Sequence, residues 1–222
     1  MESLIQTIAI YAIPVIFAIT LHEAAHGYVA RHFGDQTAWR LGRVSLNPVR
    51  HIDVMGTIVV PLIILLGTKG SFVFGWAKPV PVDFGALRHP KRDMLWVAAA
   101  GPGANLLMML GWAILLKISL MTGGGGGIFL LEVARAGVIT NVLFRLFNLL
   151  PILPLDGGRV VFSLLPNRLA YAYGQTERFG FPILIGLLLL SQFGFNVLGM
   201  VLTPMLVLVT GLVSTIFQVP LY

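Results

Sequence analysis

Six apolar segments constrain the possible fold of this chain more than any other feature. They lie at about residues 5–30, 54–66, 94–121, 128–150, 179–193 and 195–218. Hydrophobic residues make up 57% of the 222 residues, charged residues make up 11%, and mean hydropathy is +0.88. Segments of about 20 residues match a bilayer core about 30 Å thick, whereas 54–66 is short for crossing alone. We expect an all-α polytopic membrane protein with five to six transmembrane helices, forming one integral-membrane domain over residues 1–222.

Basic residues gather in short loops beside these segments. The net charge is +6, and two loops at 31–51 and 88–92 contain seven of the basic residues: Arg31, Arg40, Arg43, Arg50, Arg88, Lys91 and Arg92. Such loops favour the cytoplasmic side and anionic headgroups, so we expect membrane lipid, and not nucleic acid, as a partner. The charges predict a multi-pass cell-membrane protein with its N-terminus outside and its C-terminus in the cytoplasm. The chain has no cysteine, which excludes disulfides, thiolate metal ligands and a cysteine nucleophile.

The segment at about 71–83 differs from the rest of the chain. Both basic loops favour the cytoplasm, so the chain must turn back between residues 57 and 87. Residues 71–83 alternate apolar side chains around a glycine and two prolines, which favours extended structure. We expect a re-entrant β-hairpin-like segment whose edge could pair with an extended peptide, with Phe72, Phe74 and Trp76 as candidates for a substrate clamp. An amphipathic surface loop is the alternative.

Polar side chains interrupt the first apolar segment at Leu21-His22-Glu23-Ala24-Ala25-His26-Gly27. On a helix, His22 and His26 lie one turn apart on the same face, with Glu23 beside them. This is the HExxH pattern, in which two imidazoles hold zinc and the carboxylate takes a proton from metal-bound water. Two packing histidines beside a paired glutamate are the alternative. The cost of ionisable groups at membrane depth favours the metal site.

A catalytic zinc usually has a third protein ligand, and Asp156 is the favoured candidate. It lies in Asn148-Leu149-Leu150-Pro151-Ile152-Leu153-Pro154-Leu155-Asp156-Gly157-Gly158-Arg159, where prolines and glycines break a helix at membrane depth. An aspartate that caps a helix and pairs with Arg159 is one alternative. Glu132 or Glu177 as the third ligand is another. The remaining histidines occupy basic loops, where a solvated role is expected.

HEAAH in a transmembrane segment, followed about 130 positions later by Pro-Leu-Asp-Gly, resembles the site-2 protease family of intramembrane metalloproteases. Gly101-Pro102-Gly103-Ala104-Asn105 and the order of segments extend the likeness over most of the chain. The resemblance implies one zinc ion per chain, bound by His22, His26 and Asp156, with Glu23 as the catalytic base. It also implies cleavage of transmembrane proteins or peptides near the cytoplasmic face. The chain is most similar to the short bacterial or archaeal branch, without a PDZ or CBS domain.

Asn105 and Asn148 are polar residues within the apolar segments and have two alternative roles. They could donate hydrogen bonds to an oxyanion or to the substrate backbone, or they could join neighbouring helices. Arg145 is left without an assigned role. A membrane zinc transporter and a non-catalytic scaffold are the alternative functions for the whole chain. One HExxH motif with no further ligands along the other segments argues against transport, and the intact Glu23 argues against a scaffold.

Overall fold

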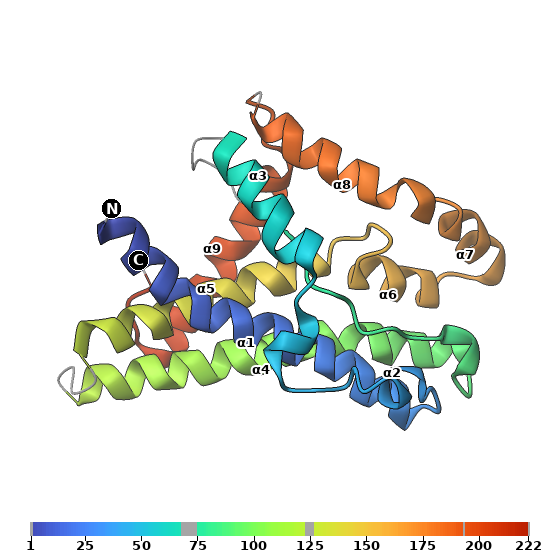
Figure 1. The fold of residues 1–222 in the computed structure, drawn as a ribbon, viewed down its shortest axis with the longest axis horizontal. Helices are drawn as coiled ribbons and strands as arrows, with labels where there is room; N and C mark the ends of the chain where they lie inside the picture. Colours follow the sequence, from blue (N-terminus) through green and yellow to red (C-terminus); the bar gives the residue numbers. More distant parts are fainter. Residues whose placement is uncertain (1, 68–74, 123–126, 193, 222) are drawn as a thin grey trace.

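The computed structural model describes residues 2–67, 75–122, 127–192 and 194–221, and in these residues it contains helices and no strand (Figure 1). The α-helices are α1 (Glu2–His32), α2 (Thr37–Arg40), α3 (Val60–Gly67), α4 (Pro90–Met121), α5 (Gly127–Asn148), α6 (Asp156–Leu164), α7 (Asn167–Gly174), α8 (Glu177–Gln192) and α9 (Val197–Phe217). Short helices of other types are η1 (Pro48–His51), η2 (Val54–Val59) and η3 (Phe84–Ala86). The all-α prediction is therefore confirmed for the described residues.

Four helices of the described chain are long and apolar enough to cross a membrane, namely α1, α4, α5 and α9. Of the five to six predicted transmembrane helices, four are therefore shown by length and composition in the described residues. The segment at 54–66 starts as a π-helix and forms an apolar helix only over Val54–Ile64. Helix α8 has 16 residues, which gives about 24 Å of helix against a core of about 30 Å. Both segments are apolar, but their described helices are shorter than the thickness of that core.

Capping groups in the sequence fix where two of the long helices begin. Helix α4 starts with Pro90, which needs no hydrogen-bond partner in the first turn, and Asp93 Oδ2 accepts the His89 amide at 2.7 Å. Helix α9 starts after Asn196, whose Oδ1 accepts the Gly199 amide at 2.8 Å. These local contacts set the ends of helices whose interiors are specified by apolar composition.

The principal core lies where α4 and α5 pack together and α9 covers them. Its buried residues are Met109, Ala113, Leu116, Ala134, Val138, Val142, Leu146, Val213, Val219 and Leu221. Small residues permit close packing of these helices. At Gly137 of α5, an added Cβ would overlap the ring of Trp112 of α4. The absence of a side chain at this position therefore lets the indole pack directly on α5.

The two chain ends lie at the same end of the α1–α4–α5 bundle (Figure 1). Helices α1 and α4 run antiparallel, and Phe17 of α1 packs edge-on against Trp112 in the second half of α4. Near the end of α4, Lys117 Nζ lies 3.4 Å from Oε1 of Gln218, the residue that follows α9. This placement differs from the expected one, in which the two termini lie on opposite sides of the membrane. Helix α9 therefore ends at the same end of the bundle as the N-terminus.

The 75–83 segment runs beside α1 without forming a strand. Alternate amides bond to neighbouring protein, because Trp76 N donates to Gly56 O and Lys78 N donates to His51 O, both at 2.9 Å. The hairpin prediction is not confirmed in these residues, since their partners are helical turns and not a second strand. Residues 71–74, with Phe72 and Phe74, lie outside the described residues.

Candidate metal centre

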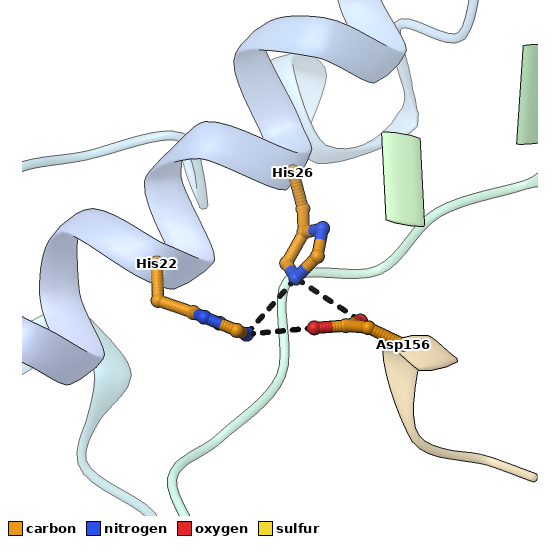
Figure 2. Close-up of side chains that lie close together, drawn as sticks. All are labelled: His22, His26 and Asp156. Atoms are coloured by element: carbon orange, nitrogen blue, oxygen red, sulfur yellow. Dashed lines mark hydrogen bonds and ion pairs between the residues drawn. The ribbon is translucent and has the colours of Figure 1, made fainter. Parts of the chain in front are cut away.

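Three predicted ligands from two distant parts of the chain meet in space (Figure 2). His22 and His26 project from one face of α1, and Asp156 is the first residue of α6. The Nε2 atoms of the histidines are 3.1 Å apart. Asp156 Oδ2 lies 3.2 Å from His22 Nε2, and its Oδ1 lies 3.4 Å from His26 Nε2. In the described chain, this is the one group of at least three acidic, histidine or cysteine side chains with ligand atoms close enough to share a metal ion.

Glycines after Asp156 allow the chain to fold tightly where α5 ends. Pro151 and Pro154 interrupt the helical path, and α6 begins at Asp156. An added Cβ at Gly157 would overlap the backbone of Leu149, and one at Gly158 would overlap the backbone of Ile152. The two glycines therefore allow the first turn of α6 to lie against the loop that precedes it. This packing directs the aspartate towards α1.

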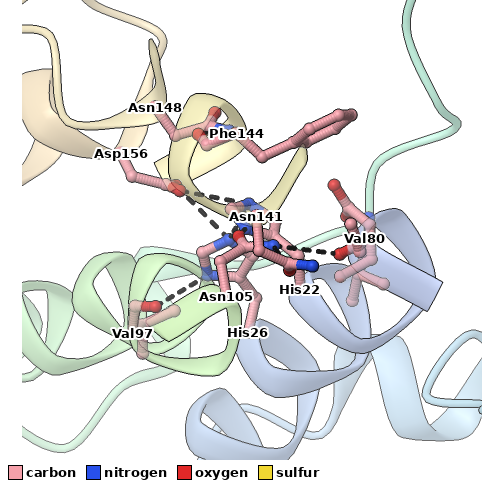
Figure 3. A network of polar contacts seen from close by, with 11 residues as sticks. His22, His26, Val80, Val97, Asn105, Asn141, Phe144, Asn148 and Asp156 are labelled. Carbon is pink, nitrogen blue, oxygen red and sulfur yellow. Dashed lines mark hydrogen bonds and ion pairs between the residues drawn. The ribbon is translucent and has the colours of Figure 1, made fainter. Parts of the chain in front are cut away.

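Hydrogen bonds on the far side of both imidazoles fix their orientation (Figure 3). His22 Nδ1 lies 2.6 Å from Asn105 Oδ1, and His26 Nδ1 lies 2.7 Å from the carbonyl oxygen of Val97. Both partners are acceptors, so each Nδ1 carries a proton and each Nε2 presents a lone pair to the centre. This is the tautomer that a metal ligand requires.

The Asn105 amide links the centre to α5. Its Nδ2 donates to Asn141 Oδ1 at 3.0 Å and lies 3.4 Å from Ala18 O, and Asn141 Nδ2 donates to Gly137 O at 2.9 Å. Both asparagines are completely buried. The Asn105 amide hydrogens are directed at these acceptors, so the geometry agrees with the interhelical alternative and not with an oxyanion donor. Asn141 was missed by sequence reasoning, although a polar residue inside an apolar span was a usable signal.

The space and chemistry of the site fit a cation. An added Cβ at Gly101 of α4 would overlap both imidazoles, so only glycine leaves room for them. Two Nε2 atoms and a carboxylate converge here, and neutral imidazoles protonated at Nδ1 would direct their lone pairs to the same point. Asp156 Oδ2 is buried without a hydrogen-bond donor. A metal ion would offset the negative charge of the Asp156 carboxylate and accept the lone pairs of these ligand atoms. Two imidazoles with a carboxylate form a donor set that suits zinc.

Glu23 lies half-buried beside the metal centre and contacts the 75–83 segment. Its Oε2 accepts a hydrogen bond from the Val80 amide at 2.7 Å. Val80 is buried, with 6% of its surface exposed. The contact ties the carboxylate of the HEAAH motif to a residue 57 positions away, which sequence reasoning did not identify.

The rival carboxylates lie in other ion pairs. Glu132 pairs with Arg135 at 2.7 Å within α5, and Glu177 pairs with Arg159 at 2.5 Å. Arg159 therefore binds Glu177, and not Asp156 as the helix-cap alternative required. Arg145 lies half-buried in the last turn of α5, where a cation is favoured by the helix dipole.

The other predicted residues lie at different distances from the centre. Asn148 is at the end of α5 and donates through Nδ2 to Phe144 O at 2.9 Å. It lies near Asp156 (Figure 3). Trp76 packs edge-on against Phe181 of α8, with ring centroids 5.6 Å apart. Tyr173 of α7 supports the loop before Asp156 by donating to the Pro151 carbonyl at 3.0 Å, and partial burial raises the pKa of its hydroxyl.

Comparison with known proteins agrees with this site. The sequence model described as "Peptidase family M50" matches residues 125–191, which include Asp156. A Bacillus subtilis (strain 168) protein named "Putative zinc metalloprotease YwhC" is 35% identical over 215 residues, covering 93% of this chain and 91% of the relative. The chain belongs to peptidase family M50. As an M50 member it is a zinc metalloprotease of the site-2 protease type.

A second M50 relative is more distant. The Mycolicibacterium smegmatis (strain ATCC 700084 / mc(2)155) protein named "Putative zinc metalloprotease Rip2" is 26% identical over 179 residues, covering 78% of this chain and 64% of that protein. No solved structure matches the chain. Both curated relatives are bacterial, and protease family membership implies a peptide substrate.

Proposed function

We propose that this M50 protein is an intramembrane endopeptidase that cuts transmembrane proteins or peptides near the cytoplasmic face. The convergence of His22, His26 and Asp156 beside Glu23, with both histidines on a membrane-length helix, is the observation that supports this function. A single domain over residues 1–222 would carry the whole activity with one zinc ion. The site residues are proposed here in the roles that follow.

The proposed chemistry divides between the metal and Glu23. A bound zinc ion would supply Lewis-acid activation of water and of the scissile carbonyl. His22, His26 and Asp156 would hold that ion. Glu23 would take the proton of the attacking water and pass it to the leaving amine. Because its Oε2 is bonded to the Val80 amide, the other oxygen, Oε1, is the one that would receive the proton.

The proposed depth follows from the position of the site in α1. His26 lies six residues before the end of α1 at His32, which is about 9 Å along the helix. Arg31 is in the last turn, and further basic residues follow in the 31–51 loop. Basic loops favour the cytoplasm, so the peptide bond would be cut in the cytoplasmic half of the membrane. With that orientation, the N-terminus of the chain and also its C-terminus would be outside.

Substrate binding requires an extended backbone at the site. A helical substrate has its amides in internal hydrogen bonds, so the segment to be cut must unwind first. Asn148, half-buried near Asp156, is proposed to bind the substrate backbone through its amide. Trp76 is proposed as an aromatic contact for the unwound segment, since its ring is partly exposed beside α8.

Reconstituted protein tests this function. The protein would be incorporated into vesicles with a synthetic transmembrane peptide, stripped of metal with a chelator, and then supplied with zinc. We expect cleavage to cease without zinc and to return with it, and mass spectrometry should place the cut near the cytoplasmic end of the peptide. Equal cleavage by stripped and restored protein would contradict the proposal. Zinc flux across the vesicle membrane without any cleavage would support the transporter alternative.

A further inference from the structure

The Val80 amide is the single backbone donor in its part of the 75–83 segment. Val80 stands between Pro79 and Pro81, neither of which has an amide hydrogen. Its nitrogen lies 2.7 Å from Glu23 Oε2 and donates a hydrogen bond to it. The two prolines therefore remove the amide hydrogens on both sides of Val80. The amide that remains is the one that contacts the carboxylate of Glu23.

The space between α1 and the 75–83 segment is also specified by the sequence. Gly27 follows directly after the HEAAH residues, and an added Cβ there would lie 3.1 Å from Val80 Cγ1 and 2.6 Å from Val44 Cγ2. Both distances are tighter than ordinary contacts. Glycine at this position lets the Val80 backbone approach Glu23 closely.

Fixed contacts hold the 75–83 segment on both sides of Val80. On one side, Arg43 Nη2 donates to the carbonyl oxygens of Lys78 and Pro79 at 3.0 and 3.3 Å. On the other side, Asp35 is buried, with 1% of its surface exposed, and its Oδ2 accepts the Asp83 amide at 2.8 Å. The amide of Val80 is therefore held in place from both directions and does not depend on Glu23 for its position.

We propose that the Val80 amide is a positioning group that holds the Glu23 carboxylate at the metal centre, with Pro79 and Pro81 making it the only amide donor of this stretch. The inference rests on the proposed role of Glu23 as the proton acceptor. A glutamate side chain has three rotatable bonds, and a hydrogen bond to one oxygen restricts them while leaving the other oxygen available. Positioning of this kind contributes to catalysis because small displacements of a catalytic group are costly.

The same geometry bears on substrate binding. The amides of Trp76, Lys78 and Val80 all bond to the protein. In an extended chain the next amides point the opposite way, and at residues 79 and 81 these are prolines. The edge of the segment that faces away from the protein therefore has no amide donor at residues 79 and 81. At these positions the segment cannot donate hydrogen bonds to a substrate strand, and the one amide donor between them binds Glu23.

Nuclear magnetic resonance of the zinc-loaded protein in micelles tests the contact directly. Labelling proline carbonyls with ¹³C and valine amides with ¹⁵N leaves only the Pro–Val pairs visible, which are 14–15, 48–49, 79–80 and 81–82. We expect the Val80 amide proton to lie downfield and to move upfield in Glu23→Ala, while the Val15 and Val49 signals stay unchanged. A Val80 signal that is the same in Glu23→Ala and in the original protein would overturn the proposal.

Cleavage kinetics test the consequence. Val80→Pro removes the amide hydrogen, whereas Val80→Ala keeps it. We expect kcat to be about 100-fold lower in Val80→Pro than in Val80→Ala, with little difference in KM or bound zinc. An unchanged kcat in zinc-loaded Val80→Pro would overturn the proposal. If Val80→Pro does not bind zinc, its kinetics do not test the positioning role, and the nuclear magnetic resonance comparison with Glu23→Ala tests it instead.

The two proposals fail differently. Full cleavage by Glu23→Gln would contradict the proposed function whatever the Val80 amide does. An inactive Glu23→Gln together with a Val80 amide that does not respond to Glu23→Ala would contradict only the positioning role.

Discussion

Asn105 Oδ1 lies 2.6 Å from His22 Nδ1, so a residue of α4 determines which imidazole nitrogen of α1 faces the metal centre. The same amide bonds to Asn141 of α5. The centre is thus supported by a buried polar chain through three membrane-length helices. Its metal affinity should depend on residues that never contact the ion.

Replacing Asn105 with leucine should weaken zinc binding about 10- to 100-fold, because His22 loses the acceptor that fixes its tautomer. Zinc affinity measured by competition with a chelator checks this. Asn148→Leu is the matched control, since its amide bonds to Phe144 O within its own helix. Equal zinc affinity of the two variants would exclude an orienting role for Asn105.

Gly101→Ala should abolish stoichiometric zinc binding, because the new Cβ would overlap the imidazoles of His22 and His26. Gly103→Ala is a close control two residues away, where an added Cβ meets nothing within 4 Å. Metal content by atomic spectroscopy should be near zero in the first variant and unchanged in the second. A fully zinc-loaded Gly101→Ala protein would show that the described spacing of α1 and α4 is not the metal-bound one.

Asp156→Ala should lose zinc, whereas Glu177→Ala should retain it. The first removes a carboxylate within 3.4 Å of both histidine Nε2 atoms, and the second removes only the partner of Arg159. Metal content of the two purified variants separates them. The reverse pattern, with zinc lost only in Glu177→Ala, would assign the third ligand to the rival carboxylate.

Both chain ends should be accessible from the same side of the membrane. The chain has no cysteine, so single cysteines can be introduced without background. Gln6→Cys and Gln218→Cys should react with an impermeant thiol reagent from the same side. Arg168→Cys should react from the opposite side, because Lys91 at the start of α4 bonds to the neighbouring Asn167. Labelling of residues 6 and 218 from opposite sides would contradict the arrangement of α9.

The candidate metal ligands could be identified from the sequence because each belongs to a local pattern. HEAAH places two histidines one helical turn apart, and the Pro-Leu-Asp-Gly sequence puts a carboxylate at a helix break. Asp156 was favoured because it lies at that break and HEAAH lacked a third ligand, although a helix-capping role was the alternative. The structure brings these residues together. Polar residues of a functional site are easy to identify in an apolar chain, because few other ionisable residues occur within membrane-spanning segments.

The supporting contacts could not be predicted, because they depend on how distant segments pack. Nothing near Val80 in the sequence indicates Glu23, and nothing near Asn105 indicates His22. The predicted number of spans exceeds the four long apolar helices of the described residues for a related reason. Composition identifies apolar segments, but α8 and the helix at 54–64 are shorter than a bilayer core, and their helical ends depend on tertiary contacts.

The most direct test of the account compares Glu23→Gln with the original protein, measuring bound zinc and cleavage of a transmembrane peptide on the same samples. The substitution keeps the size of the side chain and an oxygen that can accept from Val80, but the amide cannot take a proton from water. We predict one zinc ion per chain in both proteins and no cleavage by Glu23→Gln. Cleavage at the original rate by the zinc-loaded variant would contradict the central claim that Glu23 is the proton acceptor at this metal centre.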